Sequence, residues 1–175
     1  MAASFQLEAL FVDPFLSTKE KTETISRALL EAQLEVVALI AFAAKSKDPL
    51  KATCIEAVEF ATSQVPGIAT AFLLEFVSKE LGSKAPRVKW ESAKVIAHIA
   101  PVFPDQLEEA VKGLLINTEH TGTVVRWSAA TALGEILKLK NSRYKDLRPT
   151  LEAICEREEK NSIKKIYLAA FKKSQ

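Results

Sequence analysis

The pattern of apolar and polar positions returns four times along the chain. Four segments align without gaps, and each begins with an aliphatic residue, at Leu50, Val88, Val125 and Ile163. Their starts lie 38, 37 and 38 residues apart. A steady interval near this length is typical of a stacked two-helix repeat. The pattern therefore predicts that one helix pair recurs along the chain.

Within each segment the apolar positions fall on one side of a helix. Apolar residues stand five, seven and eight residues after the first position, and these intervals place a single stripe along an α-helix. Small residues interleaved with large ones let neighbouring helices approach closely. We therefore assign the four segments to the second helix of each repeat. The stripe consists of Ile55, Ala57, Val58, Ala93, Val95, Ile96, Ala130, Ala132, Leu133, Leu168, Ala170 and Phe171.

A first helix is expected before each second helix. Breaks are indicated by proline and glycine at Asp48-Pro49, Pro66-Gly67, Gly82 to Pro86 and Pro104-Asp105. The apolar pattern predicts first helices over residues 68–81, 105–116 and about 149–158, and one long helix over about 21–44. We expect one domain over residues 1–175, with a cap at 1–18 and repeats at about 19–65, 66–101, 102–140 and 141–175.

The second and third segments resemble the second helix of HEAT repeats. That helix typically reads Val-Arg, then alanine, then Ala-Leu-Gly, and the stretch from Val125 reads Val-Arg-Trp-Ser-Ala-Ala-Thr-Ala-Leu-Gly-Glu-Ile. The stretch from Val88 reads Val-Lys-Trp-Glu-Ser-Ala-Lys-Val-Ile. The resemblance implies an all-α fold, an α-α superhelix forming a short right-handed solenoid of about four HEAT-like helix pairs. Armadillo-like repeats are the nearest alternative, although we expect each interval to hold two helices rather than three.

Composition and charge narrow the class of protein only slightly. Hydrophobic residues make up 48% and charged residues 26% of the 175 positions, which is typical of a globular domain. The net charge of +2 neither requires nor excludes a nucleic-acid partner. The N-terminus lacks the basic start of a signal peptide, and the longest apolar run covers only residues 36–44. We therefore expect a cytoplasmic protein with no membrane partner.

The residues that could carry catalysis or bind metal stand apart from one another. His98 and His120 have no cysteine, aspartate or second histidine at ligand spacing. Cys54 and Cys155 share no short spacing, and we expect two buried free thiols. Neither a phosphate-binding glycine loop nor a nucleophile motif is present. The sequence thus predicts no enzyme activity, no catalytic residue, no metal and no cofactor.

The candidate binding residues lie on the second helices, which line the concave side in HEAT-like proteins. Trp90 and Trp127 occupy equivalent positions in adjacent repeats, with Lys94 one turn after Trp90. Tryptophan is a frequent binding anchor when it is exposed. The pattern equally allows both indoles to be packed between the repeats. We predict a partner-binding site made of Trp90, Trp127, Lys89, Arg126 and Lys94.

The position before the tryptophans is basic in every repeat. Its members are Lys51, Lys89, Arg126 and Lys164, and stacking would bring them into a row. The favoured interpretation is structural, with each cation reaching a carboxylate or a helix end in the next repeat. The alternative is a row of cations that receives an acidic partner or phosphate groups.

These features favour a non-catalytic scaffold or adaptor that binds another protein, as a helix or an extended segment, in the concave groove. The alternative is a nucleic-acid-binding protein similar to the HEAT-like DNA glycosylases, which cradle DNA with tryptophan, arginine and a nearby aspartate. Neither Asp105 nor Asp146 has a suitable place for that aspartate. A HEAT-like bilin lyase is a third class, for which no residue suggests a chromophore site.

Overall fold

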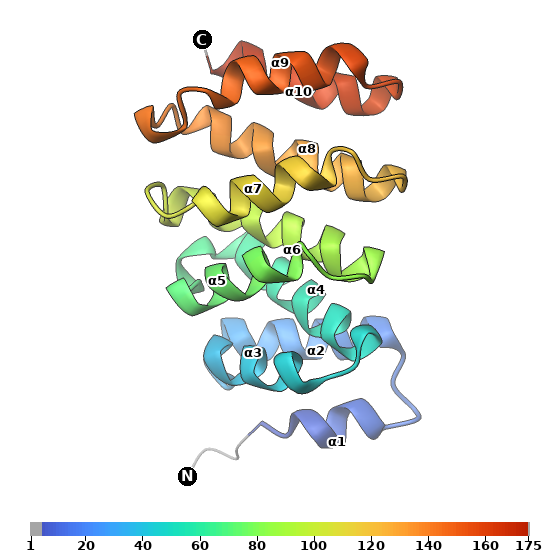
Figure 1. Ribbon diagram of the computed structural model, residues 1–175. Coiled ribbons are helices and arrows are strands. Elements are labelled where there is room, and N and C mark those ends of the chain that lie inside the picture. Colours follow the sequence, from blue (N-terminus) through green and yellow to red (C-terminus); the bar gives the residue numbers. More distant parts are fainter. Residues whose placement is uncertain (1–4, 175) are drawn as a thin grey trace.

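The computed structural model describes residues 5–174, which form a column of stacked helices (Figure 1). No strand occurs within this range. The α-helices are α1 (Leu7–Val12), α2 (Thr18–Leu30), α3 (Val36–Lys45), α4 (Asp48–Gln64), α5 (Ala71–Glu80), α6 (Pro86–Ile99), α7 (Glu108–Asn117), α8 (Thr123–Lys138), α9 (Leu147–Arg157) and α10 (Asn161–Lys173).

The helices alternate between two rows. Helices α2, α4, α6, α8 and α10 each pack on the next member of their own row, and α3, α5 and α7 do the same in the other row. Each of α4, α6, α8 and α10 also packs on the helix that precedes it in the chain. The fold is therefore an α-solenoid of about four helix pairs, as predicted, with α1 and α2 before the first pair. We call the surface of the even-numbered row the second-helix face.

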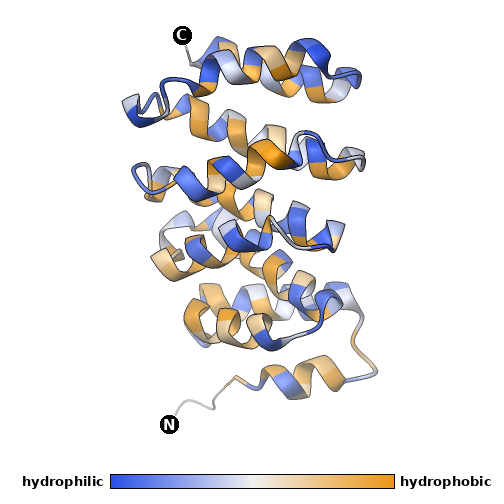
Figure 2. Cartoon of the chain, viewed as in Figure 1, coloured by the Kyte–Doolittle hydropathy of each residue, from blue (hydrophilic) through white to orange (hydrophobic). Residues whose placement is uncertain are grey.

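The predicted apolar stripe forms the interior of the solenoid. Figure 2 shows that hydrophobic and hydrophilic positions alternate along the stacked helices. The stripe residues of α4, α6 and α8 are all buried, and Leu133 of α8 is fully inaccessible. Leu168 of α10 is instead exposed over 51% of its surface, because no described helix lies beyond α10. Helices α8 and α10 approach each other closely at Gly134 of α8, where an added Cβ would lie 3.2 Å from Cβ of Ala170 in α10.

The single helix expected over residues 21–44 is wrong. The chain forms α2, breaks, and begins again as α3. Ala32 adopts the left-handed conformation, with φ of 55°, and the amides of Gln33 and Leu34 both donate to the carbonyl of Ala28, at 2.8 and 3.1 Å. This turn ends α2 and directs Leu34 into the core. The first complete pair is consequently α3 with α4.

The expectation of only two helical elements in each interval also needs correction. A single turn of 3-10 helix precedes the first helix in three of the pairs. These turns are η1 (Pro66–Ile68), η2 (Ala100–Val102) and η3 (Ser142–Tyr144). The interval accommodates them because each is only three residues long. These three repeats therefore consist of a short 3-10 turn followed by two longer α-helices, whereas the pair of α3 and α4 has no such turn before it.

Candidate partner-binding site

The two tryptophans lie near the starts of α6 and α8, on the second-helix face. The indole N–H of Trp90 donates to Oε1 of Glu91 at 2.9 Å, and the side chain is partly buried. Trp127 is exposed over 41% of its surface. Since α6 and α8 pack against each other, the partly buried indole of Trp90 and the more exposed indole of Trp127 lie on adjacent helices of one row.

Lys94 lies in a network of charged groups between α4 and α6. Its Nζ is 3.1 Å from Oε2 of Glu91 and 3.3 Å from Oε2 of Glu59. The second oxygen of Glu59 is 2.9 Å from Nε2 of His98. Glu59 and Glu91 are both buried, so the network forms a polar layer beneath the surface next to Trp90.

The carboxylates of this network respond differently to burial. Burial favours the neutral form of Glu59, but the hydrogen bond with His98 and the charge of Lys94 outweigh it, so its pKa is lowered. For Glu91 burial prevails over Lys94 and the pKa is raised. Burial opposes the charge of Lys94, yet Glu91 and Glu59 together raise the pKa of its ammonium group. Lys94 is thus charged and held between two partners.

Lys89 joins one helix pair to the next. Its Nζ donates to the carbonyl of Leu81 at 2.8 Å and to Oδ1 of Asn117 at 3.0 Å. The amide group of Asn117 donates to the same carbonyl, at 3.1 Å. Partial burial lowers the pKa of Lys89. The ammonium group of Lys89 therefore provides a hydrogen-bond donor for the carbonyl at the end of α5 and binds the side chain of the last residue of α7.

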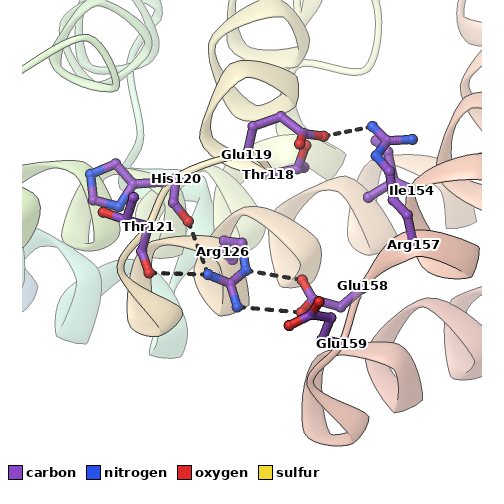
Figure 3. A pocket seen from close by; sticks show the side chains of 9 residues that line it. All are labelled: Thr118, Glu119, His120, Thr121, Arg126, Ile154, Arg157, Glu158 and Glu159. Carbon is purple, nitrogen blue, oxygen red and sulfur yellow. Dashed lines mark hydrogen bonds and ion pairs between the residues drawn. The ribbon is translucent and has the colours of Figure 1, made fainter.

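Arg126 of α8 makes the equivalent contact with the next helix pair, at the end of α9 (Figure 3). Its guanidinium donates to both oxygens of Glu158, at 3.0 and 3.3 Å, and to the carbonyls of His120 and Thr121, at 3.0 and 3.2 Å. A polar cavity of about 260 Å³ lies beside these groups. On its other side Arg157 reaches Oε1 of Glu119 at 2.6 Å.

The first three members of the basic row share this arrangement. Nζ of Lys51 lies 3.2 Å from Oε1 of Glu80. Glu80 and Asn117 each end the first helix of the following pair, and Glu158 is the C-cap of α9. The structure therefore gives Lys51, Lys89 and Arg126 internal acceptors at the joints between pairs. The side chain of Lys164 has no acceptor within residues 5–174.

Sequence reasoning missed the network around Lys94. It treated His98 as an isolated histidine, whereas the imidazole contacts Glu59, which lies 39 residues earlier. That separation is close to one repeat interval, so aligning the two residues within their repeats would have placed them side by side. His120 acts locally, because its Nδ1 accepts a hydrogen bond from the amide of Gly122 at 2.9 Å.

Neither a metal-binding cluster nor a membrane-spanning helix is found in the described part of the chain. Across residues 5–174, no three histidine, cysteine, aspartate or glutamate side chains are grouped so that they could hold a metal ion. None of the described helices is long and apolar enough to cross a membrane. Cys54 and Cys155 are free and buried, and burial raises the pKa of Cys54 to about 12.

The stacked units of one short and two longer helices define an α-solenoid of the HEAT and armadillo kind. Among solved structures the chain is similar to the designed armadillo repeat protein YIII(Dq)4CqI, with a TM-score of 0.71, 15% identity, and 97% of this chain and 80% of that chain covered. It is also similar to the designed armadillo repeat protein YIII(Dq.V1)4CPAF in complex with peptide (KR)4, with a TM-score of 0.74, 18% identity and the same coverage. No protein-family model and no curated protein sequence matches the chain.

Proposed function

We propose that this protein is a non-catalytic scaffold that binds a segment of another protein, helical or extended, along the second-helix face. The observation that carries this proposal is Trp127, an indole exposed over 41% of its surface on a well-packed helix. Trp90 lies at the equivalent place on the neighbouring helix. The complex of a designed armadillo repeat protein with peptide (KR)4 supports the choice of a peptide partner.

Trp127 supplies the anchor of the proposed site. An indole combines a large apolar surface with few rotatable bonds, so it contributes contact area at a small cost in entropy. Trp90 is fixed by its hydrogen bond to Glu91 and provides a rigid neighbouring wall. Lys94 completes the polar edge, since it is held between Glu59 and Glu91 and needs no reordering on binding.

Lys89 and Arg126 have a supporting role in this proposal. Lys89 connects α6 to the end of α7, and Arg126 connects α8 to the end of α9 and to the loop before α8, so both cations hold together the helix pairs that carry the tryptophans. A nucleic-acid backbone would have to take these cations from Asn117 and Glu158, which is unfavourable for phosphate binding. The arrangement therefore favours a protein segment over a nucleic acid.

A display selection tests the proposal directly. A peptide library is selected on the wild-type protein and counter-selected on the Trp90→Ala, Trp127→Ala double variant. We expect peptides whose affinity falls by about tenfold or more in the double variant, the loss typical of a hot-spot aromatic. Phe72→Ala on α5 is the matched control, because Phe72 is another exposed aromatic, on the first-helix row.

A pull-down from native lysate separates the two classes of partner. Wild type and double variant are compared, and each eluate is divided between protein identification and a nucleic-acid stain. Nucleic acid that is retained at low salt and released at high salt would favour the alternative function. Peptides that bind the double variant as well as the wild type would refute the site around Trp90 and Trp127.

A further inference from the structure

The outward side of α10 carries residues that are buried everywhere else in the solenoid. Leu168 occupies the same repeat position as Ile55, Ala93 and Ala130, each of which is buried. Leu168 is 51% exposed, and it lines a hollow together with Cys155, Phe171 and the charged residues Glu152, Glu156 and Lys164. The outward side of α10 thus resembles the surfaces that pack between neighbouring repeats inside the solenoid, but no described residue covers it.

The lysines of α10 indicate the charge of what would cover this end. Lys164 stands in the row with Lys51, Lys89 and Arg126, each of which has one side-chain acceptor in the following pair, at Glu80, Asn117 and Glu158. Lys172 occupies the position of Glu59, which contacts the following helix through Lys94. An occupant of the α10 end therefore needs apolar side chains and carboxylates.

The opposite end of the column offers this combination. Val12, the last residue of α1, is 79% exposed, and Phe15, in the loop between α1 and α2, is 92% exposed. Residues 1–40 include six acidic and three basic residues, so this part of the sequence carries a charge of −3. Residues 141–175 include nine basic and five acidic residues, which gives +4.

We propose that copies of this chain associate head to tail, with the α10 end of one copy on the α1–α2 end of the next. The two ends lie at opposite extremes of the column (Figure 1). Opposite charges favour this contact, whereas a symmetric contact through two α10 ends or two α1 ends would place like charges together. A head-to-tail contact uses different surfaces on the two partners, so each added copy exposes a new end and the assembly grows as an open chain.

Sedimentation velocity over a range of protein concentrations tests the association. We expect the average mass to rise with concentration past that of a dimer and to fall when the ionic strength is raised to about 1 M, where charges are screened within about 3 Å. Reversal of charge in Lys164→Glu, Lys172→Glu should weaken association by about tenfold or more. Lys79→Glu, at an exposed lysine of α5, is the matched control and should leave it unchanged.

Mixing two blocked variants tests the direction of the contact. Lys164→Glu, Lys172→Glu blocks the α10 end and Phe15→Asp blocks the other end, so neither variant should associate alone. Because each retains one intact end, the mixture should form a one-to-one dimer that grows no further. Circular dichroism confirms that both variants are folded. A wild type that stays monomeric at every concentration, or a mixture that forms no dimer, would overturn the proposal.

Discussion

Arg126 of α8 holds both carboxylate oxygens of Glu158, which caps the end of α9 one helix pair further along the chain. The same guanidinium binds the carbonyls of His120 and Thr121, in the loop before its own helix. One side chain therefore fixes a loop and the neighbouring pair together. This contact combines charge with specific geometry at a place where Glu158 is buried.

Glu158→Gln should destabilise the protein by about 2 kcal/mol at pH 7, because it removes the charge from a paired hydrogen bond. Burial raises the pKa of Glu158, but the hydrogen bonds from Arg126 prevail and leave the pKa lowered. A lowered pKa contributes stability above the unfolded value of about 4.3, and that stability is lost as the pH falls through the folded value. In denaturant titrations, the free energies of unfolding of the variant and the wild type should therefore become equal as the pH is lowered. Glu152→Gln, in an exposed pair with Arg148, should cost less than about 0.5 kcal/mol.

Leu133→Ala should cost about 2–5 kcal/mol, since it opens a cavity at a fully buried leucine. Leu168→Ala removes the same atoms from a side chain that is 51% exposed and should cost less than about 1 kcal/mol. Urea denaturation at low protein concentration measures both. Equal losses at the two leucines would contradict the assignment of the buried stripe.

The two indoles should differ in their access to a quencher. Trp127 is the more open of the two, and Trp90 is partly buried with its N–H bonded to Glu91. Acrylamide should therefore quench the fluorescence of the Trp90→Phe variant, which retains Trp127, more strongly than that of the Trp127→Phe variant. The reverse order would show that Trp127 is covered in solution and would remove the anchor of the proposed site.

Ala32→Gly should stabilise the protein by about 1 kcal/mol, because a left-handed conformation strains any residue with a Cβ. Ala32 is exposed, so the substitution removes no packing. Ala41→Gly is the matched control within α3, where glycine should cost about 1 kcal/mol through lost helix propensity. Thermal melts of the two variants should shift in opposite directions, and a shift in the same direction would argue against the turn at Ala32.

The repeat interval and the apolar stripe were sufficient to predict the second helices and the solenoid. These features follow from periodicity, which a sequence displays directly. The break at Ala32 could not be predicted because neither glycine nor proline marks it, and the apolar pattern continues from Leu29 to Leu34. The residue after the turn, Leu34, is buried, and such tertiary packing can override the local preference of alanine.

The candidate site was predictable only in outline. The alignment placed Trp90 and Trp127 at equivalent positions, but exposure depends on neighbouring helices and became visible only in the fold. The structural interpretation of the basic row required a nearby acceptor for each cation. Those acceptors lie 28 to 32 residues away, at Glu80, Asn117 and Glu158, and no local pattern identifies them.

The side-chain contacts of Lys51, Lys89 and Arg126 between neighbouring helix pairs affect how the protein unfolds. Each of these contacts connects one helix pair only to the next pair along the chain. The stability of a pair therefore depends on its nearest neighbours in the column. A pair in the middle is secured from both sides, whereas the last pair is secured from one. Amide protection against hydrogen exchange should accordingly be greatest in α6 and α8 and decline toward α1 and α10.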